Sequence, residues 1–218
     1  MKVIIPCAGK GTRRYPESKG VPKVLLDFQG HPILEHIIES ILSIHPNPHF
    51  IFVLNLDQGD QVIAYMRRYS ELKVSYCYQF DPLGFGHAVL QAKDFVGDSP
   101  VLVHACDKVL DFDEIDTFDV DYSWMAVEVI DPAPKRSFLE IEGGCVTQMI
   151  EKPHLSWNAV CYIRESNQLF DTLERMVAYN RLTAAEFQMT DALSRLVRHD
   201  GVLIKAVDFP TRYTEGGV

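Results

Sequence analysis

The chain has 218 residues, of which 47% are hydrophobic and 23% are charged, the balance of an ordinary globular core with a solvated surface. Its formal net charge of -9 argues against a non-specific nucleic-acid binder, because neutralising phosphates needs a basic surface. The length suits one α/β domain, and no apolar run approaches the roughly 20 residues that a membrane helix needs.

Short apolar runs alternate with amphipathic segments through the first half of the chain. The expected strands are residues 2–6, 50–54, 73–78 and 100–103. The expected helices are residues 33–44, where apolar side chains recur every three or four positions, a segment that Asp57 can cap, and residues 86–95. This order of strands and helices predicts a parallel sheet with helices on both faces.

The pattern changes after residue 120. Strands are expected over residues 123–130 and 202–207, and helices over residues 166–179 and 190–198. Two strand-like runs, residues 138–141 and 145–150, flank Glu142-Gly143-Gly144, which is typical of a β-hairpin. The prediction is one α/β domain over residues 1–218, with a mostly parallel central sheet, helices on both faces and a small β-hairpin subregion.

The first loop, residues 6–13, follows the first expected strand and contains Gly9, Gly11 and Arg13. Ligands of open α/β sheets bind beyond the carboxyl ends of the parallel strands. Small residues there let backbone N–H groups approach phosphate oxygens, and an arginine adds bidentate bonds. The loop is not a Walker P-loop, nor a dinucleotide fingerprint, whose third glycine would fall on Arg14. A phosphate-binding loop and a plain glycine turn after a strand are both left open.

Three more segments fall at or near expected strand ends. Lys23 follows a proline and can reach the mouth of the first loop, although a solvated lysine is the ordinary alternative. Gln79 ends a strand, where its amide can read the polar edge of a base, and Gly84 permits a flat ring to pack closely. His87 is interpreted as a structural residue at a helix start. Asp107 suits magnesium, which takes one or two carboxylates and completes its shell with water and phosphates; a turn-forming aspartate is the alternative.

The segment Glu151-Lys152-Pro153 follows the expected hairpin. A carboxylate can accept hydrogen bonds from sugar hydroxyls, and the neighbouring lysine can neutralise a sugar phosphate. An exposed Glu-Lys pair is also common on solvated surfaces, so this segment by itself indicates little.

The cysteines favour a reducing compartment. The chain has five, an odd number without any Cys-x-x-Cys: Cys7, Cys77, Cys106, Cys145 and Cys161. This spacing argues against a disulfide framework and against a zinc site. The apolar run at the N-terminus is too short for the core of a signal peptide. A cytoplasmic location is therefore expected.

Taken in order, these segments resemble the sugar-nucleotide pyrophosphorylases, and most of all the bacterial UTP–glucose-1-phosphate uridylyltransferases. The resemblance spans almost the whole chain, and the ordered set of motifs is far more specific than any one of them. It rests on residues 5–13, 18–23, 82–90 and 95–98, on Asp107, on Glu151-Lys152-Pro153, and on Glu186-Phe187-Gln188-Met189-Thr190-Asp191-Ala192.

The resemblance implies a Rossmann-like nucleotide-diphospho-sugar transferase fold, with a nucleotide-binding half over residues 1–110 and a sugar-binding half over residues 111–218. It implies that a sugar 1-phosphate attacks the α-phosphorus of a nucleoside triphosphate and that pyrophosphate leaves. Positioning and charge neutralisation would carry the catalysis. No general base is needed, because the attacking phosphate oxygen is already anionic. Partners would be the two substrates, and a homo-oligomer fits too, since such proteins often form dimers or tetramers.

The same resemblance implies a role for each matching residue. Nucleotide contacts fall to Ala8 and Gly9 through their backbone, to Gly11, Thr12 and Arg13 on the β- and γ-phosphates, and to Gln79 and Gly84 on the base. Glu151 would bind the sugar and Lys152 its phosphate. Asp107 would hold Mg²⁺, and the catalytic set would be Arg13, Lys23, Asp107 and Lys152.

The sequence departs from the pattern of these enzymes at several positions. A late aspartate that serves as a second metal ligand is replaced by Thr214 or Glu215, of which Glu215 can substitute. Lys108 follows Asp107 and could pair with it or compete with the metal. Val160 stands near where a glycine is expected beside the sugar. These changes put the sugar and the number of metals in question more than the reaction class.

Three other functions are left open. The chain could use another base, another hexose or a small phosphorylated alcohol such as phosphocholine. It could be a catalytically silent relative that binds a nucleotide or a sugar nucleotide. A dinucleotide-dependent oxidoreductase is the remotest, because the fingerprint fails at Arg14.

Overall fold

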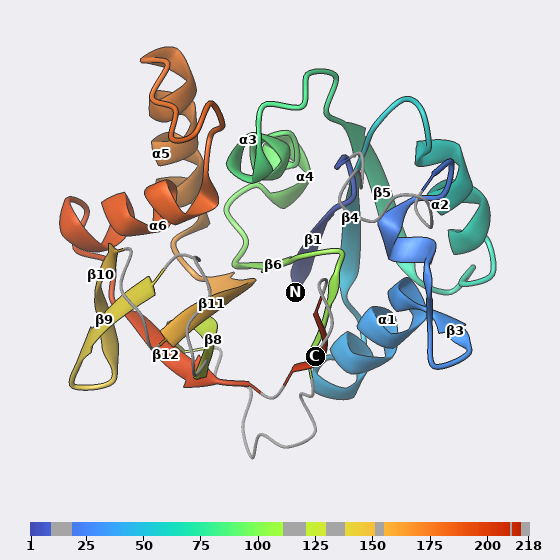
Figure 1. The fold of residues 1–218 in the computed structure, drawn as a ribbon, viewed down its shortest axis with the longest axis horizontal. Helices are drawn as coiled ribbons and strands as arrows, with labels where there is room; N and C mark the ends of the chain where they lie inside the picture. Colours follow the sequence, from blue (N-terminus) through green and yellow to red (C-terminus); the bar gives the residue numbers. More distant parts are fainter. Residues whose placement is uncertain (10–18, 111–120, 130–137, 151–154, 210, 215–218) are drawn as a thin grey trace.

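The computed structural model describes residues 1–9, 19–110, 121–129, 138–150, 155–209 and 211–214 (Figure 1). Within them, one nine-stranded sheet has the order β5 (Lys73–Tyr78), β4 (His49–Leu54), β1 (Lys2–Pro6), β6 (Val101–His104), β11 (Leu155–Ile163), β8 (Ser123–Val129), β12 (Ile204–Asp208), β10 (Cys145–Ile150) and β9 (Phe138–Glu142). Short strands also pair as β2 (Asp27–Phe28) with β3 (His31–Pro32) and β7 (Lys108–Leu110) with β13 (Thr211–Thr214). The helices are α1 (Ile33–Ile44), α2 (Gly59–Met66), α3 (Phe85–Leu90), α4 (Lys93–Val96), α5 (Ser166–Ala178), α6 (Met189–Arg198) and the 3-10 helix η2 (Lys23–Leu25).

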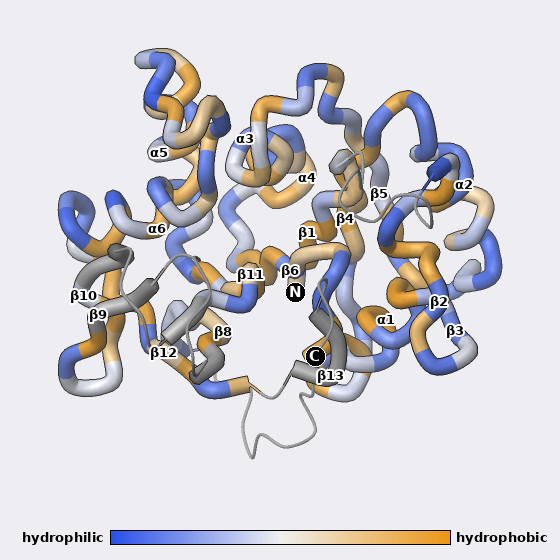
Figure 2. The backbone as a smooth tube through the Cα atoms, in the orientation of Figure 1, coloured by the Kyte–Doolittle hydropathy of each residue, from blue (hydrophilic) through white to orange (hydrophobic). Residues whose placement is uncertain are grey.

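The strands β5, β4, β1 and β6 run parallel to one another. β1 lies between β4 and β6, with Ile4 opposite both Ile51 and Val103, and β5 continues the parallel run beyond β4. Runs of mostly β-branched and aromatic residues form β1, β4 and β6, which are buried on both faces, whereas β5 at the edge of the sheet is only partly buried. Figure 2 shows β1 and β4 as hydrophobic segments. The expected α/β fold is confirmed.

Successive residues of β1 point to two separate cores, as the alternation of side chains along a strand requires. Val3 and Ile5 pack with the buried face of α1, including Ile37. Ile4 packs on the other face with residues of α3, α5 and α6, including Phe170. Figure 1 accordingly shows α1 and α2 on one side of the central strands and α5 and α6 on the other. Helices on both faces were expected and are present.

The second half of the chain extends the same sheet rather than forming a separate one. β11 runs antiparallel to β6, β8 pairs with β11, and β12 runs parallel to β8. The expected hairpin is confirmed as β9 and β10, which join through Gly143 and Gly144, both at positive φ.

Two local expectations from the sequence are wrong. The residue that precedes α2 is Gln58, not Asp57, because the Asn55 side chain accepts a hydrogen bond from the Gln58 N–H (2.8 Å) and forms the turn before the helix. The helix expected over residues 86–95 is broken into α3 and α4. The N–H groups of Gln91 and Ala92 bond to carbonyls three residues back, at 3.1 Å each, which interrupts the α-helical pattern.

Leu193→Ala should lower the free energy of unfolding by about 3 kcal/mol, because it opens a cavity in a packed core. Leu193 lies on α6 and is fully buried. Leu203→Ala removes the same atoms from a side chain that is 72% exposed, so the change there should stay below about 0.5 kcal/mol. Urea unfolding followed by tryptophan fluorescence measures both variants. Equal losses would contradict the burial of Leu193.

Candidate functional site

A pocket of about 470 Å³ lies beyond the carboxyl ends of β1 and β6. Six residues singled out from the sequence line it: Ala8, Gly9, Lys23, Gln79, Gly84 and Asp107. Ala8 and Gly9 directly follow β1, and Asp107 follows β6 by three residues. Ligand sites of open α/β sheets lie at this edge, because the carboxyl ends of the parallel strands meet there.

The loop after β1 is held in place by β4 and the turn behind it. The Cys7 N–H donates to the Val53 carbonyl (2.7 Å), and the Asn55 amide donates to the Ala8 carbonyl (3.2 Å). Burial, together with the neighbouring Cys106 thiol, raises the pKa of the Cys7 thiol well above its usual value. Cys7 is therefore a protonated packing residue rather than a nucleophile.

Lys23 and Asp107 meet across the pocket from distant parts of the chain. The Lys23 Nζ lies 3.6 Å from the Asp107 carboxylate, and the two side chains are 16% and 25% exposed. Pro22 has the extended conformation (φ −57°, ψ 137°) that starts η2 at Lys23. Lys108, which the sequence left as a possible partner of Asp107, is buried on β7.

Gln79 and Gly84 line one wall of the pocket and are hydrogen-bonded to each other, and the Gln79 amide also contacts His87 behind them. The Gln79 Nε2 donates to the Gly84 carbonyl (3.1 Å) and lies 2.9 Å from the His87 Nδ1. Gly84 has φ +108°, and a Cβ there would lie 2.8 Å from the Cβ of Glu186 and 3.0 Å from the Phe187 backbone. Close packing against a second segment, as well as backbone conformation, therefore requires glycine at this position.

That second segment, residues 186–188, packs against Gly84, contributes Glu186 to the lining of the pocket, and was given no role from the sequence. The Phe187 N–H donates to the Leu83 carbonyl, and the Gly86 N–H donates to the Phe187 carbonyl, both at 2.8 Å. Glu186 lines the pocket, and its carboxylate accepts a hydrogen bond from the Gln188 amide (2.9 Å). The only signal in the sequence was the resemblance, which quoted this segment without assigning it a function.

Strand β11 supplies the wall on the β6 side. Ala159 lines the pocket at φ +58°, and its carbonyl accepts a hydrogen bond from the Ala105 N–H (3.1 Å). The pairing of β11 with β8 shifts register between Trp157 and Cys161. Val160 is fully buried in the core. The backbone position that favours glycine is thus Ala159, and Val160 does not line the pocket.

The remaining site residues from the sequence lie outside the described residues. They are Gly11, Thr12, Arg13, Glu151, Lys152 and Glu215. Within the described part, β13 pairs with β7 so that Thr214 lies opposite Lys108, next to Asp107 in the chain. The described residues contain no group of three or more His, Cys, Asp or Glu side chains that could hold a metal ion. Asp107 supplies one carboxylate. It therefore fits a Mg²⁺ site in which bound phosphates and water supply the other ligands.

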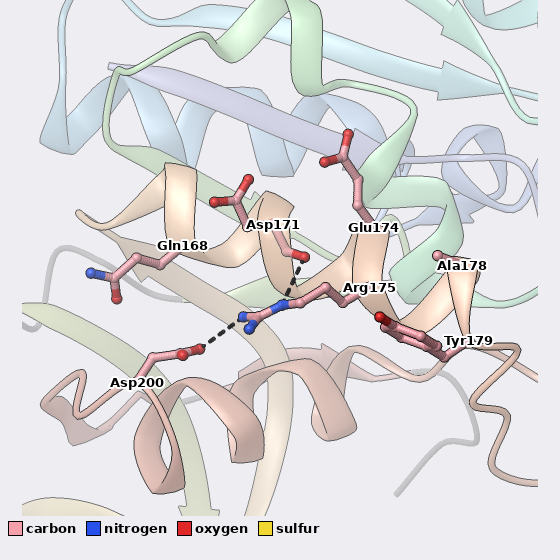
Figure 3. Close-up of a pocket in the computed structure, with 7 residues that line it drawn as sticks. All are labelled: Gln168, Asp171, Glu174, Arg175, Ala178, Tyr179 and Asp200. Atoms are coloured by element: carbon pink, nitrogen blue, oxygen red, sulfur yellow. Dashed lines mark hydrogen bonds and ion pairs between the residues drawn. The ribbon is translucent and has the colours of Figure 1, made fainter.

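A larger hollow of about 670 Å³ lies along α5 (Figure 3) and shares no lining residue with the pocket beyond β1 and β6. Arg175 bridges it, pairing with the Asp200 carboxylate (3.4 Å) and donating to the Asp171 carbonyl (3.3 Å). None of the described residues singled out from the sequence lines it, so the pocket beyond β1 and β6 is the candidate site. In the described chain, no helix is both long and apolar enough to cross a membrane.

Comparisons with known proteins find relatives that cover most of the chain. "Bifunctional protein GlmU" of Methanococcus maripaludis (strain C7) is 32% identical over 206 residues, which cover 91% of this chain and 47% of that protein. "UTP–glucose-1-phosphate uridylyltransferase YngB" of Bacillus subtilis is 29% identical over 243 residues, covering 92% of this chain and 80% of that protein. A crystal structure of apo UDP-glucose pyrophosphorylase shares the fold, with a TM-score of 0.80 at 19% identity over 97% of this chain and 91% of that one.

The chain spans about half the length of the GlmU relative. The sequence profile described as "Nucleotidyl transferase" matches residues 2–207, which include every described segment that lines the pocket. The chain belongs to the nucleotidyl transferase family.

Proposed function

We propose that the chain transfers a nucleotidyl group from a nucleoside triphosphate to a sugar 1-phosphate, with UTP and glucose 1-phosphate as its substrates. The observation that carries the proposal is the meeting of Lys23 and Asp107 at 3.6 Å in the pocket that the first loop and Gln79 also line. A cation, a carboxylate, exposed backbone and a base-reading amide together suit a nucleotide. The five free cysteines fit a cytoplasmic location.

The reaction is a single displacement. An anionic oxygen of the sugar phosphate forms a bond to the α-phosphorus, the bond from the α-phosphorus to the bridging oxygen breaks, and pyrophosphate leaves with the electron pair. Lys23 would neutralise the leaving group, with Arg13 on the same phosphates. Lys152 would neutralise the incoming phosphate, and Glu151 would bind the sugar. Placing the two phosphates in line against their mutual repulsion is the main task of the protein.

We further propose Mg²⁺ as the cofactor. Asp107 would hold it, with Glu215 as the second carboxylate. The ion would supply additional positive charge to the triphosphate. The register of β13 with β7 supports this choice. Thr214, the residue before Glu215, pairs with Lys108, the residue after Asp107. The backbone of Ala8, Gly9, Gly11 and Thr12 would hold the nucleotide, and Gln79 with Gly84 would contact the base.

The similarity to GlmU favours a second sugar. GlmU of Methanococcus maripaludis is slightly more similar in sequence than the uridylyltransferase YngB, at 32% against 29% identity. N-acetylglucosamine 1-phosphate is therefore the second candidate acceptor. Glu151, which would contact the sugar itself, lies outside the described residues.

Pyrophosphate release tests the proposal. The purified chain is mixed with Mg²⁺, glucose 1-phosphate and, in separate reactions, UTP, dTTP, CTP, GTP or ATP. The same series is repeated with N-acetylglucosamine 1-phosphate and with phosphocholine. Release with UTP and glucose 1-phosphate, lost in Lys23→Ala and on chelation of Mg²⁺, is the expected result.

Each other outcome corrects a different part of the proposal. Release with another triphosphate or acceptor keeps the reaction and changes the substrate. Nucleotide binding by calorimetry with no release from any combination would mean a binding protein and would contradict the proposed reaction.

A further inference from the structure

We propose that His87 is a positioning residue that holds the Gln79 side-chain amide in one orientation, so that the pocket presents a hydrogen-bond acceptor and selects uracil over cytosine. The inference rests on the proposed function and deepens it, because it names the interaction that decides the base. From the sequence, His87 was interpreted only as a structural residue at a helix start.

The hydrogen bonds of the Gln79 side chain are compatible with only one of the two orientations of its amide group. A carbonyl oxygen can only accept, so the group 3.1 Å from the Gly84 carbonyl must be the amide nitrogen. The same nitrogen lies 2.9 Å from the His87 Nδ1, so its second N–H donates to the ring. Reversing the amide would set two carbonyl oxygens against each other at Gly84. Both donors are therefore used, and Oε1 is the polar atom left for the pocket.

Burial makes this orientation matter. Gln79 is 6% exposed and lines the pocket, and its backbone N–H donates to the Leu54 carbonyl at the end of β4 (2.9 Å). A buried N–H without an acceptor is costly, whereas one that is paired costs little. The amide therefore keeps its nitrogen toward His87 and Gly84 while a base occupies the pocket.

The surroundings of His87 keep its ring in the accepting form. Burial lowers the pKa of His87, opposed in part by the Asp81 carboxylate and by a hydrogen bond to the Asp81 backbone, which favours a neutral ring with one accepting nitrogen. Each ring nitrogen faces an amide nitrogen, and the shorter contact, 2.9 Å at Nδ1 against 3.3 Å at Nε2, assigns the acceptor to Nδ1. The centroid of the Phe187 ring, which belongs to residues 186–188, lies 6.2 Å from the centroid of the His87 ring. Gln91, one turn along α3, lies 3.3 Å from Nε2 on the other side of the ring. The ring is thus held between two elements.

An acceptor at this place distinguishes the two pyrimidines. Uracil carries an N–H at ring position 3, which can donate to Oε1. Cytosine carries a lone pair at the same ring position, which would oppose Oε1. Sites built to bond one polar group reject analogues that leave a buried partner unpaired. Without His87, the amide loses one of the two contacts that hold it, and the discrimination should weaken.

The test compares His87→Leu with His87→Asn. Leucine fills space but accepts no hydrogen bond, while the asparagine oxygen can stand near the position of Nδ1. Affinities for UTP and CTP are measured by calorimetry for the wild type and both variants. Where turnover is seen, kcat and KM for UTP are measured at saturating sugar 1-phosphate. Leu203→Ala serves as the unrelated control, because Leu203 is 72% exposed and does not line the pocket.

The expected result is a roughly tenfold loss of UTP affinity in His87→Leu. CTP affinity should change little, so the preference for UTP over CTP falls about tenfold. KM should rise by a similar factor while kcat changes less than about threefold. His87→Asn should restore most of the preference.

The inference is overturned if folded His87→Leu keeps the wild-type preference, or if His87→Asn loses as much as His87→Leu, which would mean that only ring packing matters. It is also overturned if the wild type does not prefer UTP. A wild type that prefers UTP in binding but releases no pyrophosphate would contradict the proposed reaction and leave this inference standing.

Discussion

Asp107→Asn should lower kcat on the order of 10³-fold and leave the fold intact. The variant keeps the size of the side chain but removes the negative charge at the mouth of the pocket. Groups that stabilise charge in a transition state are worth about 10² to 10³ each, and loss of a metal-binding carboxylate weakens the ion as well. Pyrophosphate release at saturating substrates measures the effect.

Stability should change far less than activity in this variant. The ion pair with Lys23 is partly exposed, and such pairs contribute about 1 kcal/mol or less. Asp57→Asn, which makes the same substitution at an exposed position outside the pocket, is the matched control and should keep wild-type kcat. If Asp107→Asn retains kcat within about threefold, Asp107 has no place in the chemistry.

Gly84→Ala should lower the free energy of unfolding by about 4 kcal/mol and weaken nucleotide binding. Two costs add up. Gly84 has φ 108° and ψ 174°, a backbone region almost confined to glycine, where a side chain costs about 1–3 kcal/mol. Forcing a Cβ into packed neighbours costs about 1–3 kcal/mol more. At Gly84 the new atom would lie 2.8 Å from the Cβ of Glu186 and 3.0 Å from the Phe187 backbone. Relief requires residues 186–188 to move away from the wall of the pocket.

Gly201→Ala separates the two costs. Gly201 has φ +69°, and nothing lies within 4 Å of its added Cβ, so only the backbone cost of about 1–2 kcal/mol applies. Urea unfolding of both variants gives the difference in free energy, and calorimetry with UTP gives the effect on binding. Similar losses of stability in the two variants would show that close packing against residues 186–188 is unimportant.

The central strand that the sequence did not predict is β11. Its residues 160–163 are all buried, so they do not alternate between core and solvent. The strand is irregular around Ala159, where φ is positive without a glycine to mark it. Its neighbour β6 lies far away in sequence, with Val160 opposite His104. Pairing over such a distance depends on packing of the whole sheet and leaves little local pattern.

The sequence by itself determined the elements whose pattern is local. The parallel strands around β1 and the helix Ile33–Ile44 follow from hydrophobic periodicity, and the hairpin follows from its paired glycines. It also indicated the pocket residues, since loops after parallel strands share one edge. Tertiary structure alone brought Lys23 to Asp107, Phe187 to Leu83 and Gly86, and the Gln79 amide to His87. Apart from Gln79 and His87, these partners lie on separate segments, and no local pattern can encode a contact whose geometry is set by the packing of both cores against one sheet.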